Sequence, residues 1–331
     1  MPPPTAGPRL ALVTNLFSNS VSTYSVDSQT GQLTPKDTVP TGDTNSRIIA
    51  VTPSGRFAYV ANIDSNDISV FAIDANTGSL TMVGSPVPSG DGPRFIAIGP
   101  EGNRLYVVNQ DADHITAFSI NPNTGALTPL TGSVPTDDLP IALAFHPSGQ
   151  FAYVVNARSS DITVYRVDNT GALGLLGAVP APTNPSSIAI APSGKSAYVT
   201  PLGANGVTSF SIDVNSGALT PLPRVNSGSG PISMTVDPRG RFAYVTNLND
   251  NNVSIYAIDA VSGALAPVSL VPAGSNPVAI ALDASGRFAY VANLGSDNVT
   301  LFSVDSNTGA LTPVGAPTSA GTGPGWVILL N

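Results

Sequence analysis

Short apolar runs alternate with polar turns along the whole chain, and residues 53–78 show the pattern in full. This stretch reads PSGRFAYVANIDSNDISVFAIDANTG. A turn leads into an apolar run that ends at Asn62, and a polar loop, a second apolar run and a turn ending at Gly78 follow. The runs are rich in Val, Ile, Tyr and Phe and are bounded by Gly, Pro, Asn and Asp, which is typical of short β-strands.

The same unit recurs at a nearly constant spacing. Its first apolar run ends at Asn15, Asn62, Asn109, Asn156, Pro201, Asn247 and Asn293, in steps of 47, 47, 47, 45, 46 and 46 residues. Seven units with a period in the mid-forties predict a seven-bladed β-propeller, an all-β fold with one four-stranded antiparallel blade per unit. We expect the recurrent Asn to cap the loop that follows it. Because Pro201 cannot do so, its blade should have a different loop.

Each blade is expected to contain four strands. The first complete unit places them at 46–51, 57–62, 68–74 and 80–87. Phe57 and Ala58 are both apolar although they point to opposite faces, so the sheet must be covered on both sides, as it is between two neighbouring blades. The outermost strands contain Pro and Thr, which suits a solvent-exposed edge.

The two ends of the chain predict how the ring closes. The N-terminal run 10–15 (LALVTN) corresponds to the second strand of a unit, and the C-terminal run 325–331 (GWVILLN) corresponds to the missing first strand. One blade should therefore combine a C-terminal strand with three N-terminal strands, which leaves no unpaired edge at the junction. We expect a single domain over 1–331, with blades at about 45–90, 91–137, 138–182, 183–228, 229–274, 275–320, and 321–331 with 9–44.

Charge and composition narrow the classes of function. The net charge is −8, the pI is about 4.5, and the only lysines are Lys36 and Lys195. Such a chain lacks a basic surface for nucleic acid, and no apolar run is long enough to span a membrane. The absence of cysteine excludes thiol chemistry and disulfides. No signal peptide is evident, and the composition slightly favours an extracellular or periplasmic location over the cytoplasm. We expect a monomer.

The loops that vary most between units should carry the function. One rim of the disc collects the PSG and NTG hairpins, and the other collects the connections between blades and the loops after the recurrent Asn. On this variable rim, Arg47 and Arg94 begin the innermost strands of adjacent blades and can both point into the central channel. Two convergent guanidinium groups bind a carboxylate or phosphate. The alternative is that each arginine pairs with nearby Asp43 or Asp91.

His114 is the candidate catalytic residue. It follows Asp111 and Asp113 at the boundary between a loop and a strand, and a histidine beside carboxylates can transfer protons or bind a metal. Its alternative role is that of a solvated loop residue. The candidate ligand-binding residues are Arg47, Arg94, Asp91, Asp111 and Asp113. The only other histidine, His146, opens a hairpin on the opposite rim, so we interpret it as structural.

The metal and cofactor content is left open. The Asp- and Asn-rich loops 64–67, 111–113 and 249–252 offer oxygen ligands of the kind that Ca²⁺ prefers, although none matches a complete cation-binding loop and such residues also form turns. We expect no cofactor, and Ca²⁺ is the one ion that the pattern suggests.

The repeat resembles the YVTN-type propellers, since residues 244–247 spell YVTN, and it resembles the lactonase family of seven-bladed propellers. Residues 92–109 and 140–165 are close to that family's repeats. The family includes bacterial 6-phosphogluconolactonases and fungal carboxymuconate cyclases, so the resemblance implies lactone hydrolysis. The family pattern has Arg-His on an inner strand and Glu after the strand-ending Asn. This chain has Ile141-Ala142 and Ala157 in one blade, and Arg94-Phe95 and Gln110 in the neighbouring blade.

Three hypotheses about function follow. The first is a binding module whose variable rim holds a small anionic molecule or a protein partner, because an acid–base mechanism cannot run on Ile, Ala and Phe. The second is a hydrolase or isomerase that acts on a sugar lactone, in which Arg47 and Arg94 bind the anion and His114 handles protons. The third is a structural repeat protein of the cell surface.

Overall fold

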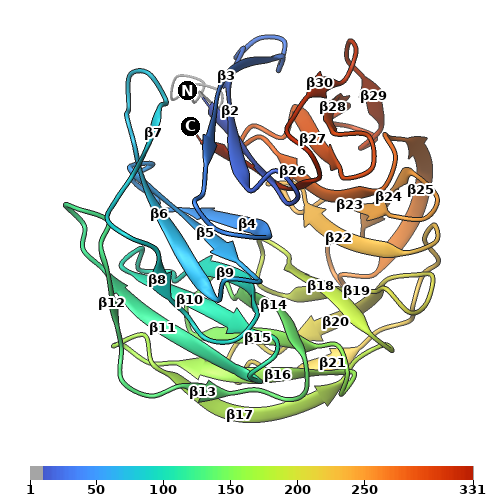
Figure 1. Ribbon diagram of the computed structural model, residues 1–331. Coiled ribbons are helices and arrows are strands. Elements are labelled where there is room, and N and C mark those ends of the chain that lie inside the picture. Colours follow the sequence, from blue (N-terminus) through green and yellow to red (C-terminus); the bar gives the residue numbers. More distant parts are fainter. Residues whose placement is uncertain (1–9, 331) are drawn as a thin grey trace, which may run out of the picture.

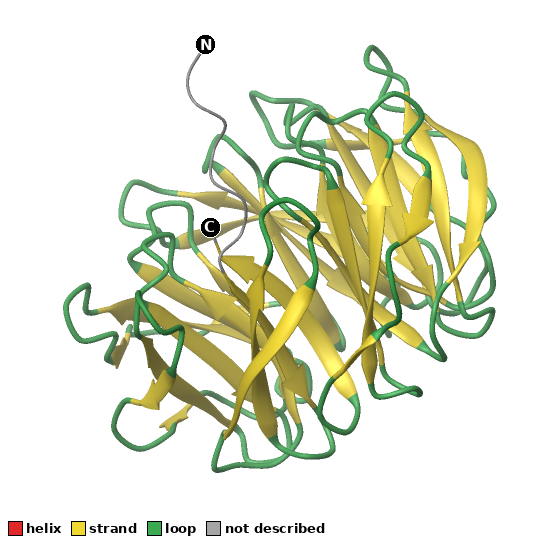
Figure 2. Cartoon of the chain, turned by 90° about the horizontal axis from the view of Figure 1, so that it is seen from above, coloured by secondary structure: helices red, strands yellow, loops and turns green. Residues whose placement is uncertain are grey.

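The computed structural model describes residues 10–330, which form seven antiparallel sheets arranged around a central axis (Figure 1). The described residues contain strands and loops but no helix, and the view from above shows the sheets side by side as blades (Figure 2). The prediction of an all-β, seven-bladed propeller is confirmed. Nothing among the described residues is a helix with the length and apolarity that a membrane crossing requires.

The innermost and second strands of each blade are short and nearly uniform. The innermost strands are β4 (Ser46–Val51), β9 (Pro93–Ile98), β14 (Pro140–Phe145), β18 (Pro185–Ile190), β22 (Pro231–Val236), β26 (Pro277–Leu282) and β31 (Pro324–Leu330). The second strands are β1 (Leu10–Asn15), β5 (Phe57–Asn62), β10 (Arg104–Asn109), β15 (Phe151–Asn156), β19 (Ser196–Pro201), β23 (Phe242–Asn247) and β27 (Phe288–Asn293). Six of these second strands are buried throughout because blades cover both of their faces.

The third strands lie outside the second strands and are followed by outer strands of unequal length. The third strands are β2 (Ser20–Val26), β6 (Asp67–Ile73), β11 (His114–Ile120), β16 (Asp161–Val167), β20 (Thr208–Ile212), β24 (Asn252–Ile258) and β28 (Asn298–Val304). Three outer strands are continuous: β3 (Leu33–Pro40), β17 (Leu173–Pro180) and β25 (Leu265–Pro272). One blade keeps only a short outer strand, β21 (Leu219–Pro221).

The remaining three outer strands are each broken into two pieces. They are β7 (Leu80–Met82) with β8 (Val87–Pro88), β12 (Leu127–Pro129) with β13 (Val134–Pro135), and β29 (Leu311–Pro313) with β30 (Thr318–Ser319). The prediction of one strand over 80–87 is therefore wrong. Met82 pairs with Phe71, and Val87 pairs with Ile68. The four residues 83–86 of the outer strand therefore lie opposite only residues 69 and 70 of β6. The extra length forms a loop in which Gly84 has a left-handed conformation, with φ of 68°.

The ring closes as the two ends of the sequence predict. Strand β31 pairs antiparallel with β1, Leu330 opposite Leu10 and Val327 opposite Val13, in a sheet of order β3-β2-β1-β31. The predicted strand over 325–331 begins one residue earlier, and its last residue lies outside the described residues. We call this sheet the mixed blade.

The recurrent Asn caps the following loop, as expected. Asn62 is fully buried, and its side-chain amide donates to Asp67 Oδ1 at 2.8 Å and to Ser69 Oγ at 2.7 Å. In the blade where Pro201 takes this position, the third strand β20 is shortened to five residues and begins only at Thr208. The prediction that this blade has a different loop is confirmed.

Candidate functional site

Every innermost strand contains a β-bulge at the same place, one residue after its start. In β4, Ser46 pairs with Asn62 but Ile48 pairs with Ala61, so Arg47 is the extra residue. The same shift leaves one extra residue in each of the other blades, and the seven are Arg47, Arg94, Ile141, Ser186, Ile232, Val278 and Gly325. A bulge redirects the side chain of the extra residue. We call these seven residues the bulge ring.

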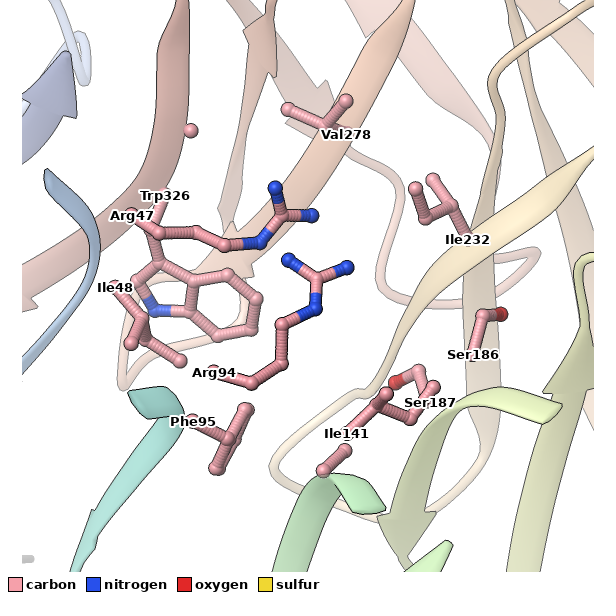
Figure 3. Close-up of a pocket in the computed structure, with 12 residues that line it drawn as sticks. Arg47, Ile48, Arg94, Phe95, Ile141, Ser186, Ser187, Ile232, Val278 and Trp326 are labelled. Carbon is pink, nitrogen blue, oxygen red and sulfur yellow. The ribbon is translucent and has the colours of Figure 1, made fainter. Parts of the chain in front are cut away.

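The bulge ring surrounds a cavity of about 40 Å³ on the propeller axis. All seven residues line it, together with Ile48, Phe95, Ala142, Ser187 and Trp326. Figure 3 shows the guanidinium groups of Arg47 and Arg94 next to each other on one side, while Ile141, Ile232 and Val278 lie across from them. The prediction that both arginines point into the channel is confirmed by this arrangement.

Neither arginine side chain has a counter-charge within the described part of the chain. No ion pair or side-chain hydrogen bond joins Arg47 or Arg94 to Asp43, Asp91 or any other residue from 10 to 330, and the carboxylate oxygen Oδ2 of Asp43 is itself buried without a partner. The expected alternative of surface ion pairs is therefore not seen. Burial in the channel lowers the pKa of Arg47 to about 10, which still leaves the guanidinium charged at neutral pH.

The backbone of Arg47 is held by residues of the mixed blade. The Thr14 hydroxyl donates to the Arg47 carbonyl oxygen at 2.7 Å. A Cβ atom at Gly325 would lie 3.0 Å from the same oxygen, so glycine leaves the room that this contact requires. The chain's single tryptophan, Trp326, packs edge to face against Phe95, with ring centroids 5.9 Å apart, and completes an aromatic wall beside the arginines.

His114 and the aspartates near it lie outside this cavity. His114 is the first residue of the third strand β11, with its ring Nδ1 2.9 Å from the carbonyl oxygen of Ala112. Asp113 Oδ1 accepts the backbone N–H of Leu139 at 2.8 Å, which ties the loop to the next blade. Asp91 and Asp111 are exposed. The structure thus brings the two arginines together, and none of the four other candidates lines the cavity.

His146 has a structural role in the fold, as the sequence indicated. It is buried, and its Nε2 donates to the carbonyl oxygen of Gly194 in the next blade at 2.8 Å, while Nδ1 is 2.7 Å from Ser148 Oγ. Both ring nitrogens therefore have partners in the assigned geometry. This histidine joins two blades.

The acidic loops that suggested Ca²⁺ are used as turns. Asn66 Oδ1 accepts the N–H of Gly92 at 2.8 Å, and Asn251 Oδ1 accepts the N–H of Asn276 at 2.7 Å. Residues 10–330 contain no group of three or more His, Cys, Asp or Glu side chains placed to hold a metal ion. Calcium binding remains a hypothesis drawn from the sequence.

Sequence reasoning found the two arginines but not the whole lining of the cavity. Ser187, Ile232 and Trp326 line the cavity and were not singled out. The signal was present in the repeat, because the extra residue follows the Pro that opens six of the seven innermost strands. Comparing that one position across the seven units gives the composition of the ring directly.

The sequence matches the family model described as "Lactonase, 7-bladed beta-propeller" over residues 7–91, 86–142, 140–281 and 267–329. No curated protein matches it. Ile141 and Ala142 line the cavity, and so does Phe95 in the adjacent blade. The described residues that line the cavity include no carboxylate and no histidine.

Solved structures of similar shape are distant in sequence. A Bacteroides fragilis protein named provisionally as a 6-phosphogluconolactonase superimposes with a TM-score of 0.87 at 19% identity, covering 100% of both chains. The periplasmic gluconolactonase of Pseudomonas aeruginosa gives a TM-score of 0.85 at 21% identity, covering 97% of this chain and 98% of the other. At this identity the two structures support the fold.

Proposed function

Because this chain belongs to the family of seven-bladed β-propeller lactonases, we propose that it binds a small anionic molecule in the bulge ring through Arg47 and Arg94. The observation that carries the proposal is the absence of any counter-charge for these two arginines among residues 10–330. Two positive charges that share a poorly solvated channel repel each other and lose hydration. An anion between them offsets both effects.

The chemistry of the arginines defines the part of the ligand that they hold. Guanidinium groups match the planar fork of a carboxylate or the oxygens of a phosphate. A cavity of about 40 Å³ accepts a few water-sized groups, which is enough for an acid group and little more. The rest of the ligand must then extend along the channel or toward the variable rim.

A thermal-shift panel tests the proposal. Sugar acids, phosphosugars and sugar lactones are added to the wild type, to Arg47→Gln/Arg94→Gln and to Arg158→Gln, which removes an exposed arginine on the same rim. A ligand at a hundred times its Kd adds about 2.7 kcal/mol to the stability. We expect an anion to shift the wild type and Arg158→Gln alike and to leave the double variant unchanged. A shift of equal size in the double variant would place the binding site elsewhere.

A lactone hydrolase is the second candidate, and membership of the lactonase family favours it. Hydrolysis needs a base to activate water, and the candidate base His114 begins a third strand rather than lining the cavity. We propose the binding function first for this reason. Turnover of a sugar lactone that is lost in His114→Ala, with the fold intact, would reverse the order of the two candidates.

We also propose a location outside the cytoplasm. The Pseudomonas aeruginosa relative in shape is named as periplasmic, and the absence of cysteine suits an oxidising compartment. Fractionation of the native host, with detection by an antibody, distinguishes the two compartments.

A further inference from the structure

The bulge ring divides into a charged side and an apolar side. Arg47 and Arg94 come from adjacent blades, whereas three of the other five ring positions are aliphatic, namely Ile141, Ile232 and Val278. The wall beside the arginines is aromatic, since Phe95 and Trp326 pack together there. A ligand whose acid group faces the arginines therefore places its other atoms against aliphatic and aromatic side chains.

Few hydrogen-bonding groups remain for a ligand beyond its acid group. Ser186 Oγ is already surrounded, 2.9 Å from the carbonyl oxygen of Pro231, from the Thr200 carbonyl oxygen and from Thr200 Oγ1. Ser187 is the one other side chain with a hydroxyl among the described residues of the lining, and it makes no hydrogen bond with them. A polyol would bury several hydroxyl groups in a cavity where the Ser187 hydroxyl is the hydrogen-bonding partner left for them. Each ligand hydroxyl without a partner weakens binding.

The loops that precede the innermost strands bond to a second repeated set of residues, which are mostly apolar. The set consists of the residue that directly follows each second strand. The backbone N–H of this residue donates a hydrogen bond to the carbonyl oxygen of the residue that directly precedes an innermost strand. The members of the set are Leu16, Ile63, Gln110, Ala157, Leu202, Leu248 and Leu294. Six of the seven are apolar, and a Cβ atom at Gly325 of the bulge ring would lie 3.0 Å from Leu16 Cδ1, so Leu16 contacts the bulge ring. An apolar ligand body that outgrows the cavity on this side meets the side chain of Leu16.

We infer that the bulge ring selects a compact carboxylate with an apolar body, of which an aryl carboxylate is the representative, over polyhydroxylated acids. This inference rests on the proposed function, because it assigns a chemical class to the anion that Arg47 and Arg94 bind. The acid group lies between the two guanidinium groups. The first carbon atoms of the ligand body lie against Phe95, Trp326 and Ile232, where desolvation of their surface favours binding, and the rest of the body extends along the channel.

Fluorescence of Trp326 tests the inference directly, since it is the only tryptophan in the chain and it lines the site. The wild type is titrated with phenylacetate, with gluconate and with the uncharged phenylacetamide, and calorimetry confirms each Kd. We expect phenylacetate to bind at least about tenfold more tightly than gluconate, a difference of about 1.4 kcal/mol, and more tightly than phenylacetamide. Ile232→Asn should reduce that preference several-fold, because it replaces apolar surface with an amide.

The control variant is Val261→Asn, which changes a valine that is 92% exposed on the hairpin rim. It should keep the wild-type preference. Gluconate binding as tightly as phenylacetate in the wild type, with both lost in Arg47→Gln/Arg94→Gln, would overturn the inference and leave the proposed anion site standing. Binding of phenylacetamide equal to that of phenylacetate, or no binding of any acid, would overturn the proposed function as well.

Discussion

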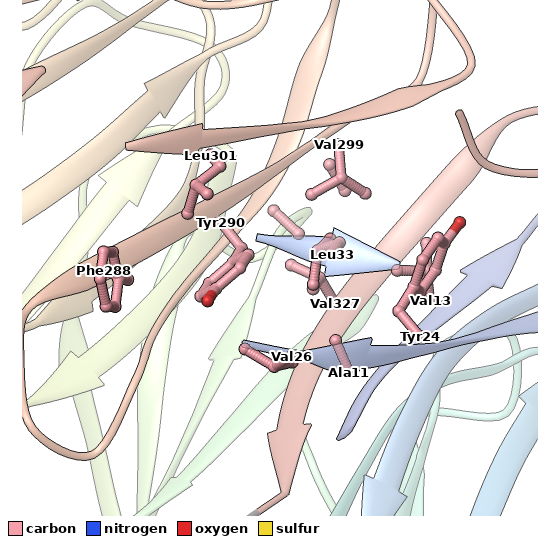
Figure 4. Close-up of a cluster of buried hydrophobic side chains, with 12 residues drawn as sticks. Ala11, Val13, Tyr24, Val26, Leu33, Phe288, Tyr290, Val299, Leu301 and Val327 are labelled. Atoms are coloured by element: carbon pink, nitrogen blue, oxygen red, sulfur yellow. The ribbon is translucent and has the colours of Figure 1, made fainter. Parts of the chain in front are cut away.

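The buried hydroxyl of Tyr290 donates a hydrogen bond to the carbonyl oxygen of Gly31, 259 positions earlier in the chain, at 2.8 Å. Tyr290 lies on β27, and Gly31 lies in the hairpin of the mixed blade, so the bond crosses the junction where the ring closes. Figure 4 shows the buried hydrophobic cluster at this junction, which contains Tyr290, Val26 and Leu33. Five other junctions repeat the hydrogen bond, through Tyr59–Gly125, Tyr106–Gly171, Tyr153–Gly217, Tyr198–Gly263 and Tyr244–Gly309. At the seventh junction Leu12 takes the place of the tyrosine.

Tyr290→Phe should destabilise the protein by about 1–3 kcal/mol, because the Gly31 carbonyl oxygen is left buried without its donor. Denaturant unfolding measures the loss. Tyr24→Phe serves as the control, since the bond from Tyr24 to the Ser319 carbonyl oxygen is only partly buried and water can replace it. Equal losses in the two variants would show that the depth of the bond is unimportant.

All nine tyrosines have a raised pKa, chiefly because burial disfavours the phenolate. For Tyr198 and Tyr256 the pKa is about 12. The unfolded chain then releases protons near the ordinary pKa of about 10, while the folded chain retains them. Stability should be fully present below about pH 10 and should fall as the pH rises toward the folded values.

Tyrosinate absorbance during an alkaline titration measures this effect. We expect no ionisation while the fold persists and a cooperative rise when it unfolds. Tyr198→Phe should make the loss of stability with pH less steep, since one titrating group is removed. Gradual ionisation near pH 10 in the folded protein would contradict the prediction.

Ser209 is fully buried, and its hydroxyl has no hydrogen-bond partner among the described residues. It stands opposite Tyr198, at a position where neighbouring blades have Val164 and Ile255. Ser209→Ala should therefore be neutral or stabilising by up to about 1 kcal/mol. The matched control is Ser69→Ala, which is equally buried but loses bonds with Asn62 and with the Thr41 carbonyl oxygen, and which should cost about 1–3 kcal/mol. An equal loss of stability in Ser209→Ala and Ser69→Ala would show that the Ser209 hydroxyl is not unpaired.

Closure of the ring should depend on β31 far more than its length suggests. Val327 is 3% exposed and lies in the core that joins the mixed blade to β27. Val327→Asp, like deletion of 325–331, should lower the melting temperature sharply or prevent folding, because it buries a charge without a partner. Leu175→Asp changes a residue that is 59% exposed on an outer strand and should have little effect. A wild-type melting curve for the truncated protein would contradict this account of closure.

Arg47→Gln and Arg94→Gln should each raise the stability of the ligand-free protein, because each removes a charge that has no counter-charge in residues 10–330. Their mutual repulsion is relieved by either change alone. The double variant should therefore gain less than the sum of the two single gains, by about 0.5 kcal/mol or more. Additive gains would mean that the two guanidinium groups do not interact.

The repeat allowed the fold to be predicted from the sequence almost strand by strand. The recurrent Asn and the apolar runs placed β4 and β5 at the observed residues, and the two chain ends showed how β31 would meet β1. The outer strands were less predictable. Their few contacts let a left-handed glycine such as Gly84 decide between a continuous strand and two pieces.

The site was predictable only in part. Arg47 and Arg94 stood out because charge is rare in this chain, but the bulge that turns them into the channel has no signature in a single unit. His114 drew attention through its chemistry, and the structure places it two strands away from the axis, on β11. Residue type alone could not give the distance between a rim loop and the channel.

The most direct test of the central claim is a crystal structure with selenate, an anion whose selenium atom is located by anomalous scattering. The account predicts a selenium peak between the guanidinium groups of Arg47 and Arg94 in the wild type and none there in Arg47→Gln/Arg94→Gln. A bulge ring without selenium, in crystals where selenate is bound at Arg158 or beside His114, would contradict it.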